Sequence, residues 1–397
     1  MKIALISHRL PPSGAGQALV IYRILQNVDP TRYCLISPEP QPGSSKATYT
    51  AELPGPHYRL PQPFRVKRGE RFGLRHLREG MNIPLAVRQR ASRIADIVRR
   101  EKCEAIVACT GEVTLLPAAY RASQSLRVPF YAYIFDDYSY REWEDPAAAF
   151  WARRFEPRLM KNAAKVIVPN EMLGDDLRKR YGIEPVVIHN SFDISPYEVN
   201  GRPRPDNEEV KIVYTGEIYE AHFDAFRNMI EALKAMNRPD VKLHIYTNRS
   251  AEDLDKLGIS GPVVHHPGRP VTEVPNIQMN ADMLFLPLAF DSPYPHLVRT
   301  SSTTKLGEYL AARRPVLVHA PKDSFVSWYF RTHQCGVVVD QNDPSRLAEG
   351  IQSILRDDAL RQRLTTTGWE RARQDFSIEK SRADFARLVG WNEAEHR

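Results

Sequence analysis

The chain has 397 residues, of which 42% are hydrophobic, 26% charged and 9% aromatic, and its formal net charge is +7. This composition excludes a disordered or fibrous protein, and the length predicts two domains of roughly 200 residues each. No apolar run approaches the ~20 residues that a membrane-spanning helix needs. His8 and Arg9 interrupt the first apolar stretch, which therefore predicts a buried strand and not a secretion signal.

Short apolar runs alternate with amphipathic stretches along the whole chain. In the first half, the predicted strands are Ile3–Ser7, Cys34–Ser37, Ala105–Cys109, Phe130–Phe135, Val166–Pro169 and Val186–Ile188, and the predicted helices are Gln17–Asn27, Ala86–Arg100 and Glu171–Tyr181. In the second half, the strands are Lys211–Thr215, Lys242–Tyr246, Val263–His265, Met283–Pro287, Pro315–His319 and Gly336–Val339, and the helices are about Phe223–Met236, Thr304–Ala312 and Ser345–Arg356. Buried strands that alternate with helices predict two Rossmann-like α/β domains with parallel sheets, which face each other across a cleft.

A polar, proline-rich segment separates the two halves. We therefore expect an N-terminal domain over residues 1–195, a hinge over 196–209 and a C-terminal domain over 210–375. The four cysteines are scattered and form no Cys-x-x-Cys pair, which argues against a zinc site or a disulfide framework. This cysteine usage fits a reducing cytoplasm.

Positive charge is concentrated between Arg59 and Lys102. The basic residues within this stretch are Arg65, Lys67, Arg68, Arg71, Arg75, Arg78, Arg88, Arg90, Arg93, Arg99 and Arg100. The stretch is either a solvated helix face or a contact with an anionic surface, and peripheral contact with an anionic membrane is the preferred functional interpretation. No nucleic-acid-binding module accompanies it, so we expect no nucleic-acid partner.

The stretch that carries the most chemistry is Ser301–Glu308. Four hydroxyl residues, Ser301, Ser302, Thr303 and Thr304, lead into a predicted helix, whose free N–H groups favour an anion. Lys305 in the first turn would neutralise a phosphate, and Glu308 could accept hydrogen bonds from a ribose diol. The alternative is a capped surface helix with a weak Lys305–Glu308 ion pair.

Further candidates lie in the first half. Asp136 and Asp137 end an apolar strand, where they could orient an acceptor hydroxyl or a sugar, or could simply begin a turn. His8 follows the first strand and is a candidate acceptor or sugar contact. Gly14 and Gly16 form a glycine loop, but the third position of a dinucleotide fingerprint is Leu19, which argues against NAD.

Several motifs, in their order along the chain, resemble those of retaining GT-B glycosyltransferases, family four in particular. The segments that carry the resemblance are Pro11–Gly16, Ala164–Glu171, Val187–Asp193, Val213–Gly216, Thr304–Ala312 with Arg314–Val316, and Phe376–Ser377. The resemblance implies that residues 210–375 bind the donor and that residues 376–397 form a helix that returns to the N-terminal domain. It also implies donor contacts from Gly14, Gly16, Gly216, Glu217, Arg249, Ser301–Lys305 and Glu308.

The chain departs from the family at two points. The family has two glutamates with seven residues between them; Glu308 is the second, and Thr300 stands at the position of the first. The family's phosphate-binding cations after the first donor-domain glycine are replaced by Glu217 and Glu220. Lys305, the hydroxyl cluster and either Arg249 or Arg299 would then have to neutralise the diphosphate.

The resemblance implies a metal-independent, retaining transfer of a sugar, without a cofactor. The donor would be a nucleoside diphosphate sugar of the UDP or GDP type, and the acceptor a hydroxyl of a saccharide or lipid-linked molecule. Cell-surface polysaccharide or glycolipid synthesis is the expected setting. The alternatives are a degenerate GT-B binding or scaffold protein, and a nucleotide-sugar epimerase or hydrolase.

Overall fold

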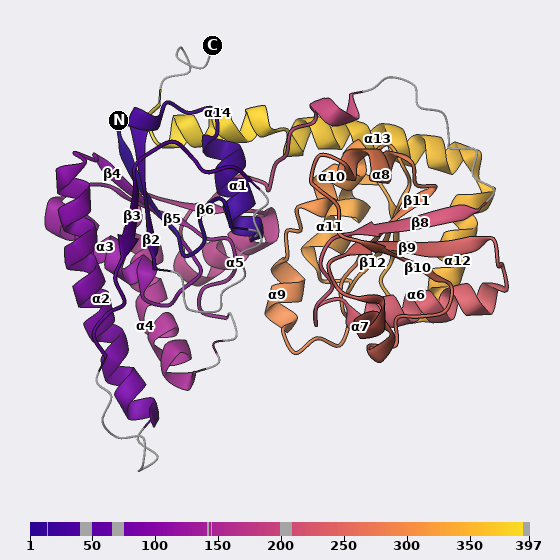
Figure 1. Ribbon diagram of the computed structural model, residues 1–397, viewed down its shortest axis with the longest axis horizontal. Helices are drawn as coiled ribbons and strands as arrows, with labels where there is room; N and C mark the ends of the chain where they lie inside the picture. Colours follow the sequence, from indigo (N-terminus) through magenta and orange to yellow (C-terminus); the bar gives the residue numbers. More distant parts are fainter. Residues whose placement is uncertain are drawn as a thin grey trace. The chain divides into compact units, whose positions relative to one another are not determined.

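The predicted strands form two parallel sheets, and each sheet is the centre of a separate unit of the chain (Figure 1). The computed structural model describes residues 1–13, 15–39, 50–65, 75–140, 143, 145–198 and 209–391. Unit 1 comprises Met1–His189 and Ser381–Arg397, and unit 2 comprises Asn190–Lys380. The chain therefore passes from one unit to the other twice, and most of the predicted hinge lies outside the described residues.

The sheet of unit 1 has seven parallel strands in the order β3-β2-β1-β4-β5-β6-β7. These strands are β1 (Ile3–Ile6), β2 (Tyr33–Pro38), β3 (His57–Leu60), β4 (Ala105–Cys109), β5 (Phe130–Tyr133), β6 (Lys165–Val168) and β7 (Val186–Val187). The central strands are apolar throughout because both faces of the sheet are covered. The order reverses between β1 and β4, the position where ligands bind in open α/β sheets.

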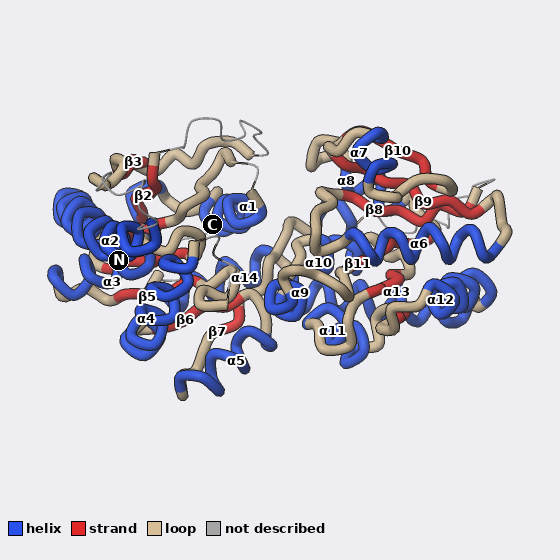
Figure 2. Tube along the Cα trace, turned by 90° about the horizontal axis from the view of Figure 1, so that it is seen from below, coloured by secondary structure: helices blue, strands red, loops and turns tan. Residues whose placement is uncertain are grey.

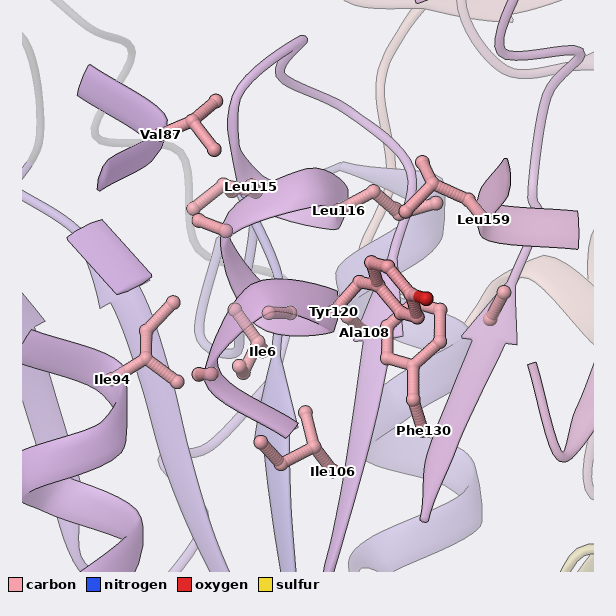
Figure 3. Packing of buried hydrophobic residues seen from close by; sticks show 14 of the residues in the cluster. Ile6, Val87, Ile94, Ile106, Ala108, Leu115, Leu116, Tyr120, Phe130 and Leu159 are labelled. Carbon is pink, nitrogen blue, oxygen red and sulfur yellow. The ribbon is translucent and has the colours of Figure 1, made fainter. Parts of the chain in front are cut away.

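Helices cover both faces of this sheet. They are α1 (Gly16–Leu25), α2 (Arg75–Arg100), α3 (Leu115–Leu126), α4 (Pro146–Asn162), α5 (Glu171–Tyr181) and the end of α14 (Ile378–Leu388). One face, with Ile6, Ile106 and Ala108, packs against α2, α3 and α4, as Figure 3 shows. The other face packs against α1 and the chain's return segment, which contributes Phe385 and Trp391.

The sheet of unit 2 has six parallel strands in the order β10-β9-β8-β11-β12-β13. They are β8 (Val210–Thr215), β9 (Val241–Thr247), β10 (Val263–Pro267), β11 (Met283–Pro287), β12 (Val316–His319) and β13 (Val337–Val339). The helices are α6 (Phe223–Met236), α7 (Ala251–Lys256), α8 (Val274–Met279), α9 (Pro295–Thr300), α10 (Lys305–Ala311), α11 (Phe325–His333), α12 (Pro344–Arg356) and α13 (Asp358–Phe376). The reversal of strand order falls between β8 and β11.

Helices α6 and α12 pack side by side over one face of this sheet, as the ribbon and the tube views show (Figures 1 and 2). The predicted pair of Rossmann-like domains is confirmed, and so is the return of the C-terminal helix to the N-terminal domain. Within the described part of the chain, no helix combines the length and apolarity needed to cross a membrane.

Candidate functional site

In unit 1, polar side chains gather where β1 and β4 end, at the reversal of strand order. His8 follows β1, and Gly111 and Glu112 follow β4. Gly111 has a φ of +151°, and a β-carbon there would lie 2.8 Å from His8 Cβ. Only glycine allows this close approach, which brings the loop after β4 against His8.

Glu112 is held in place by charged and polar neighbours. The guanidinium of Arg90, a buried residue of α2, donates to Glu112 and to the Thr114 hydroxyl, which itself donates to Glu112 Oε1 at 3.0 Å. His8 Nδ1 lies 3.6 Å from Glu112 Oε2. Burial alone would raise the pKa of Glu112, but the contacts with His8 and Arg90 outweigh it and lower the pKa to about 2. The carboxylate therefore stays ionised.

Asp136 belongs to the same edge of the sheet. Its backbone N–H, like that of Phe135, donates to the Thr110 hydroxyl at the end of β4. Gln17 of α1 donates to the Thr110 carbonyl and to Ser7 Oγ, so it ties α1 to the ends of both central strands. The structure thus brings His8 and Asp136 to one edge of the sheet.

Asp137 has a different environment from Asp136. It is buried, and its carboxylate pairs with Arg180 of α5 at 2.6 Å. Arg180 also contacts Glu156, which is fully buried, at 3.2 Å. Burial and the charge of Asp137 raise the pKa of Glu156. Asp137 is therefore one member of a buried charge cluster that joins α4 and α5 to the loop after β5.

The predicted glycine loop is described only in part, because Gly14 lies outside the described residues. Gly16 is the first residue of α1, and a β-carbon there would meet nothing within 4 Å. The backbone at Gly16 therefore faces open space.

In unit 2, the turn after β8 lies against the first residue of α10. Gly216 has a φ of +129°, and a β-carbon there would lie 2.5 Å from Lys305 Cε and 2.8 Å from Lys305 Nζ. The Gly216 N–H donates to the carbonyl of Tyr246 on β9 at 2.8 Å. The lysine predicted to bind phosphate and the glycine predicted to approach the donor are therefore in direct contact.

The ammonium of Lys305 lies beside an aromatic ring. Its Nζ lies 5.3 Å from the ring centroid of Tyr214. Burial lowers the pKa of Lys305, and the charges of Glu308 and Glu217 oppose this effect. Burial, together with the charge of Lys305, lowers the pKa of His222 to about 3, so this imidazole stays neutral beside the ammonium.

A buried hydrogen-bond chain fixes α10 to the end of β8. The Tyr309 hydroxyl accepts from the Thr215 N–H at 3.0 Å, and Gln278 donates to the Thr215 hydroxyl at 3.1 Å. Tyr197 in turn donates to Gln278 Oε1 at 2.7 Å. These contacts hold Lys305 against the Gly216 turn.

The four hydroxyl residues occupy the connection between α9 and α10. The Thr303 hydroxyl accepts from the Lys305 N–H at 3.4 Å, and the Ser302 carbonyl accepts from Asn190 at 2.6 Å. Thr304 is the N-cap, but its side chain makes no capping hydrogen bond, and Ser301 ends α9. Since α10 has only seven residues, its dipole is a weaker source of anion affinity than the sequence predicts.

Glu217 and Arg249 lie beside the Gly216 turn. Glu217 is exposed and accepts from Asn248 at 2.6 Å. The Arg249 guanidinium donates to the Ile218 carbonyl and lies 5.7 Å from the Phe223 ring centroid. The Arg249 guanidinium is therefore used to stabilise the turn. The cation that contacts Gly216 is Lys305.

The basic region predicted from the sequence divides into several environments. Arg88, Arg93, Arg99 and Arg100 are exposed, whereas Lys67, Arg68 and Arg71 lie outside the described residues. Arg90 is buried against Glu112, so the expectation that it forms part of a solvated or membrane-facing surface is wrong.

A cavity of about 610 Å³ in unit 1 is lined by Arg65, Arg78, Glu79, Ile83, Val113, Asp145 and Ala148.

Five residues of these sites were missed by the sequence reasoning: Arg90, Glu112, Tyr214, His222 and Tyr309. Tyr309 lies inside the motif Thr304–Ala312, and His222 lies six residues after Gly216. Both residues could therefore have been selected from the sequence motifs. Glu112 follows a predicted strand, but no motif surrounds it. Only the strand order, which places β4 beside β1, brings it to His8.

Two parallel α/β units, with polar residues gathered at the ends of their central strands, define a GT-B architecture. Residues 49–195 match glycosyltransferase family 4, and residues 209–357 match the glycosyl transferases of group 1. The chain is therefore a glycosyltransferase of the GT-B class, and hence a transferase enzyme. No curated protein sequence matches it.

Similar solved structures extend over the whole fold. HepE of Anabaena in complex with UDP shares 16% identity, with 98% of this chain and 100% of that chain covered, at a TM-score of 0.66. Sucrose-phosphate synthase from Thermosynechococcus elongatus shares 14%, with 98% of each chain covered, at a TM-score of 0.68. A glycosyltransferase from Rickettsia africae shares 13% sequence identity, with 98% of this chain and 99% of that chain covered, at a TM-score of 0.66. Identities this low establish the fold alone.

Proposed function

We propose that the protein is a retaining glycosyltransferase that moves a sugar from a nucleoside diphosphate sugar to an acceptor hydroxyl. The acceptor is a saccharide or a lipid-linked molecule, in cell-surface polysaccharide or glycolipid synthesis. The observation that carries the donor assignment is the contact between Lys305 and the Gly216 turn. UDP and UDP-glucose in the HepE structures support a donor of the UDP type.

Unit 2 supplies the charge and polar groups for the donor. Lys305 neutralises the diphosphate, with the hydroxyls of Ser301, Ser302, Thr303 and Thr304 as further donors. Because Lys305 is poorly solvated and already held in place, it stabilises the leaving diphosphate without the reorganisation that water would require. Glu308 accepts from the ribose diol, and the reaction needs neither a metal ion nor a cofactor.

Nucleotide binding to variants of Lys305 and Glu308 tests this proposal. Thermal unfolding is followed with UDP, GDP, ADP, TDP and CMP for the unmodified protein and for Lys305→Ala and Glu308→Ala. One diphosphate at 100 times its dissociation constant adds about 2.7 kcal/mol of stability. We expect UDP to do so, both variants to lose the effect, and Lys322→Ala, at an exposed lysine of the same unit, to keep it.

A panel in which no nucleotide stabilises the protein would contradict the proposal. It would favour a scaffold function, in which the exposed Glu217 disfavours the diphosphate. Release of free altered sugar without any dependence on an acceptor would favour an epimerase or hydrolase.

We further propose that unit 1 makes peripheral contact with an anionic membrane. Three large apolar side chains of this unit are each more than 60% exposed: Phe64 by 68%, Met81 by 67% and Phe150 by 62%. The cavity lined by Arg65 and Arg78 lies beside the same segments, namely the loop after β3 and the N-terminal parts of α2 and α4. Apolar side chains beside arginines suit an interface with acidic headgroups.

Cosedimentation with phosphatidylcholine vesicles, with and without phosphatidylglycerol, tests the membrane contact. We expect salt-sensitive binding to the anionic vesicles alone, which Arg65→Ala weakens by about 1 kcal/mol. Replacing Phe64, Met81 and Phe150 together by serine should abolish it. Val271→Ser, at an exposed apolar residue of unit 2, serves as the control. Equal binding to both vesicles would contradict the contact.

A further inference from the structure

Two cysteines that are 69 residues apart in the sequence meet in unit 1. Cys34 lies near the start of β2 and Cys103 shortly before β4, and β1 lies between these two strands. Their Sγ atoms are 3.5 Å apart and form a hydrogen bond. Because neighbouring strands of this sheet are parallel, the two thiols lie at its N-terminal edge, opposite to the edge that holds His8 and Asp136.

The backbone around both thiols is fixed by hydrogen bonds. The Cys103 N–H donates to the carbonyl of Val98, in the last turn of α2, at 2.9 Å. The next N–H, that of Glu104, donates to the Lys2 carbonyl at 2.8 Å. Cys34 is part of the parallel pairing of β2 with β1. The short distance between the two sulfur atoms is therefore set by the fold around them.

The two thiols differ in exposure and in acidity. Cys34 is 0% exposed and Cys103 is 6% exposed. The hydrogen bond from Cys34 lowers the pKa of the Cys103 thiol, and so does the charge of Lys2, against burial and the charges of Glu101 and Glu104. The same hydrogen bond and burial raise the pKa of Cys34. Since the thiolate is the reactive form of cysteine, Cys103 is the better nucleophile of the two.

We propose that Cys34 and Cys103 are a reversible redox pair, which a peroxide converts into a disulfide and a dithiol restores. Cys103 reacts first with the peroxide, and Cys34 then forms the bond to it. The disulfide would close the chain between residues 34 and 103, a stretch that contains β3 and α2. It would therefore tie the end of α2 to β2 and restrict local unfolding of unit 1.

The oxidation balances with one molecule of hydrogen peroxide. The Cys103 thiolate attacks one peroxide oxygen, the O–O bond breaks, and the other oxygen leaves as hydroxide, which takes up a proton to become water. The product at Cys103 is a sulfenic acid. The Cys34 sulfur then attacks the Cys103 sulfur, the S–O bond breaks, and a second water leaves with the proton of the Cys34 thiol. The two sulfurs together lose two electrons, and the peroxide gains them.

A simpler role for the two cysteines would be to fill space in the core. Both belong to the apolar cluster between the sheet and α2, and a buried free cysteine behaves as a small apolar side chain. In that role the thiols would react only after the protein unfolds. The two roles therefore differ in whether the folded protein forms the disulfide.

Peptide mapping of the unmodified, folded protein separates the two roles. The protein is treated with hydrogen peroxide, its remaining thiols are blocked, and it is digested without reductant by trypsin and by a protease that cleaves after glutamate. Both are needed because trypsin releases Cys103 and Cys109 in one peptide, residues 103–121, which cleavage after Glu104 divides. We expect two peptides joined through Cys34 and Cys103, which dithiothreitol separates. Blocked thiols at both positions, or a bond that forms only in urea, would overturn the proposal.

Two variants test the order of the steps. In Cys34→Ser the sulfenic acid should persist at Cys103, where dimedone traps it. In Cys103→Ser, Cys34 should stay unlabelled, because it is fully buried. Labelling of Cys34 instead of Cys103 would overturn the assigned roles. Cys335→Ser, at a buried cysteine of unit 2, is the control and should form the disulfide as the unmodified protein does.

Thermal unfolding without nucleotide measures the effect of the bond on stability. We expect oxidation to raise the Tm of unit 1 by about 5 °C or more, because the closed chain has fewer unfolded conformations. Dithiothreitol should reverse this shift, and Cys34→Ser and Cys103→Ser should not show it. An unchanged or lower Tm of the oxidised, unmodified protein would contradict the restriction of local unfolding.

Discussion

Gly216 and Lys305 are in such close contact that a single added carbon atom on the glycine would collide with the lysine side chain. A β-carbon would lie 2.5 Å from Lys305 Cε, and the φ of +129° at Gly216 is itself unfavourable for any other residue. The position of the first residue of α10 therefore depends on a glycine directly after β8. The donor assignment depends on this contact.

Gly216→Ala should disrupt both the fold of unit 2 and nucleotide binding. The strained backbone conformation costs about 1–3 kcal/mol, and relief of the clash moves Lys305 away from the turn. Urea denaturation and the UDP-induced shift in Tm measure the two effects. Gly182→Ala in unit 1 is the matched control, because Gly182 also has a positive φ, +65°, but open space around its β-carbon. A Gly216→Ala protein that keeps full UDP binding would contradict the importance of this contact.

Lys305→Met should stabilise the protein without nucleotide and abolish its response to nucleotide. Burial lowers the pKa of Lys305 in the folded state. Between this lowered pKa and the unfolded value of about 10.5, the unfolded chain therefore binds more protons than the folded protein. The charged lysine therefore costs stability at neutral pH, and the cost disappears as pH rises through this window. A gain of about 1 kcal/mol would raise Tm by roughly 2–4 °C. A lower Tm for the variant, measured without nucleotide, would show that Lys305 is stabilising.

Asp136→Asn and Asp137→Asn should have different consequences although the residues are adjacent. Asp137 pairs with Arg180, so its replacement should destabilise unit 1 by about 1.5–3 kcal/mol. Asp136 is proposed to contact the acceptor, so its replacement should lower transfer with little effect on Tm. Thermal unfolding and glycosyl transfer, measured on both variants, separate the two roles. Equal loss of stability in both would contradict the distinction.

Acid should destabilise the protein partly through buried histidines. Burial lowers the pKa of His222 to about 3 and that of His319 to about 4, below the unfolded value of 6.5. Between the folded and unfolded pKa values, the unfolded chain binds more protons than the folded protein. The free energy of unfolding is therefore highest above about pH 6.5 and falls as pH decreases. Each histidine contributes up to about 1.4 kcal/mol per pH unit.

Urea denaturation from pH 7 to pH 4 checks the acid prediction. His222→Gln should make the pH dependence of unit 2 shallower. An unchanged dependence in this variant would show that His222 is not the responsible group.

The architecture was predictable from the sequence because buried parallel strands are apolar throughout. The strand that was missed, β3, has the sequence HYRL, and only Leu60 of its four residues is buried, so its composition resembles a loop. The start of α2 was missed because Pro84 lies inside the helix, and a proline normally marks a helix boundary. Helix α3 was missed because its apolar, alanine-rich sequence shows little alternation of polar and apolar faces at its start.

The candidate site was less accessible than the fold. Lys305, Glu308 and Gly216 belong to motifs, so a single sequence suffices to select them. Glu112 and Arg90 belong to none, and they come together only because β4 lies beside β1 and α2 packs next to both. Charge is equally misleading in isolation: Arg90 and Arg88 are two residues apart, yet one is buried and the other exposed.

The return of the chain to unit 1 has a consequence for biosynthesis. Phe385, Ala386, Val389 and Trp391 are buried in the core of unit 1, and the Trp391 indole donates to the Met1 carbonyl at 2.7 Å. All of unit 2 is therefore translated before the side chains that complete unit 1 leave the ribosome. Unit 2 can therefore finish folding first, while part of the core of unit 1 stays uncovered until residues 385–391 are available.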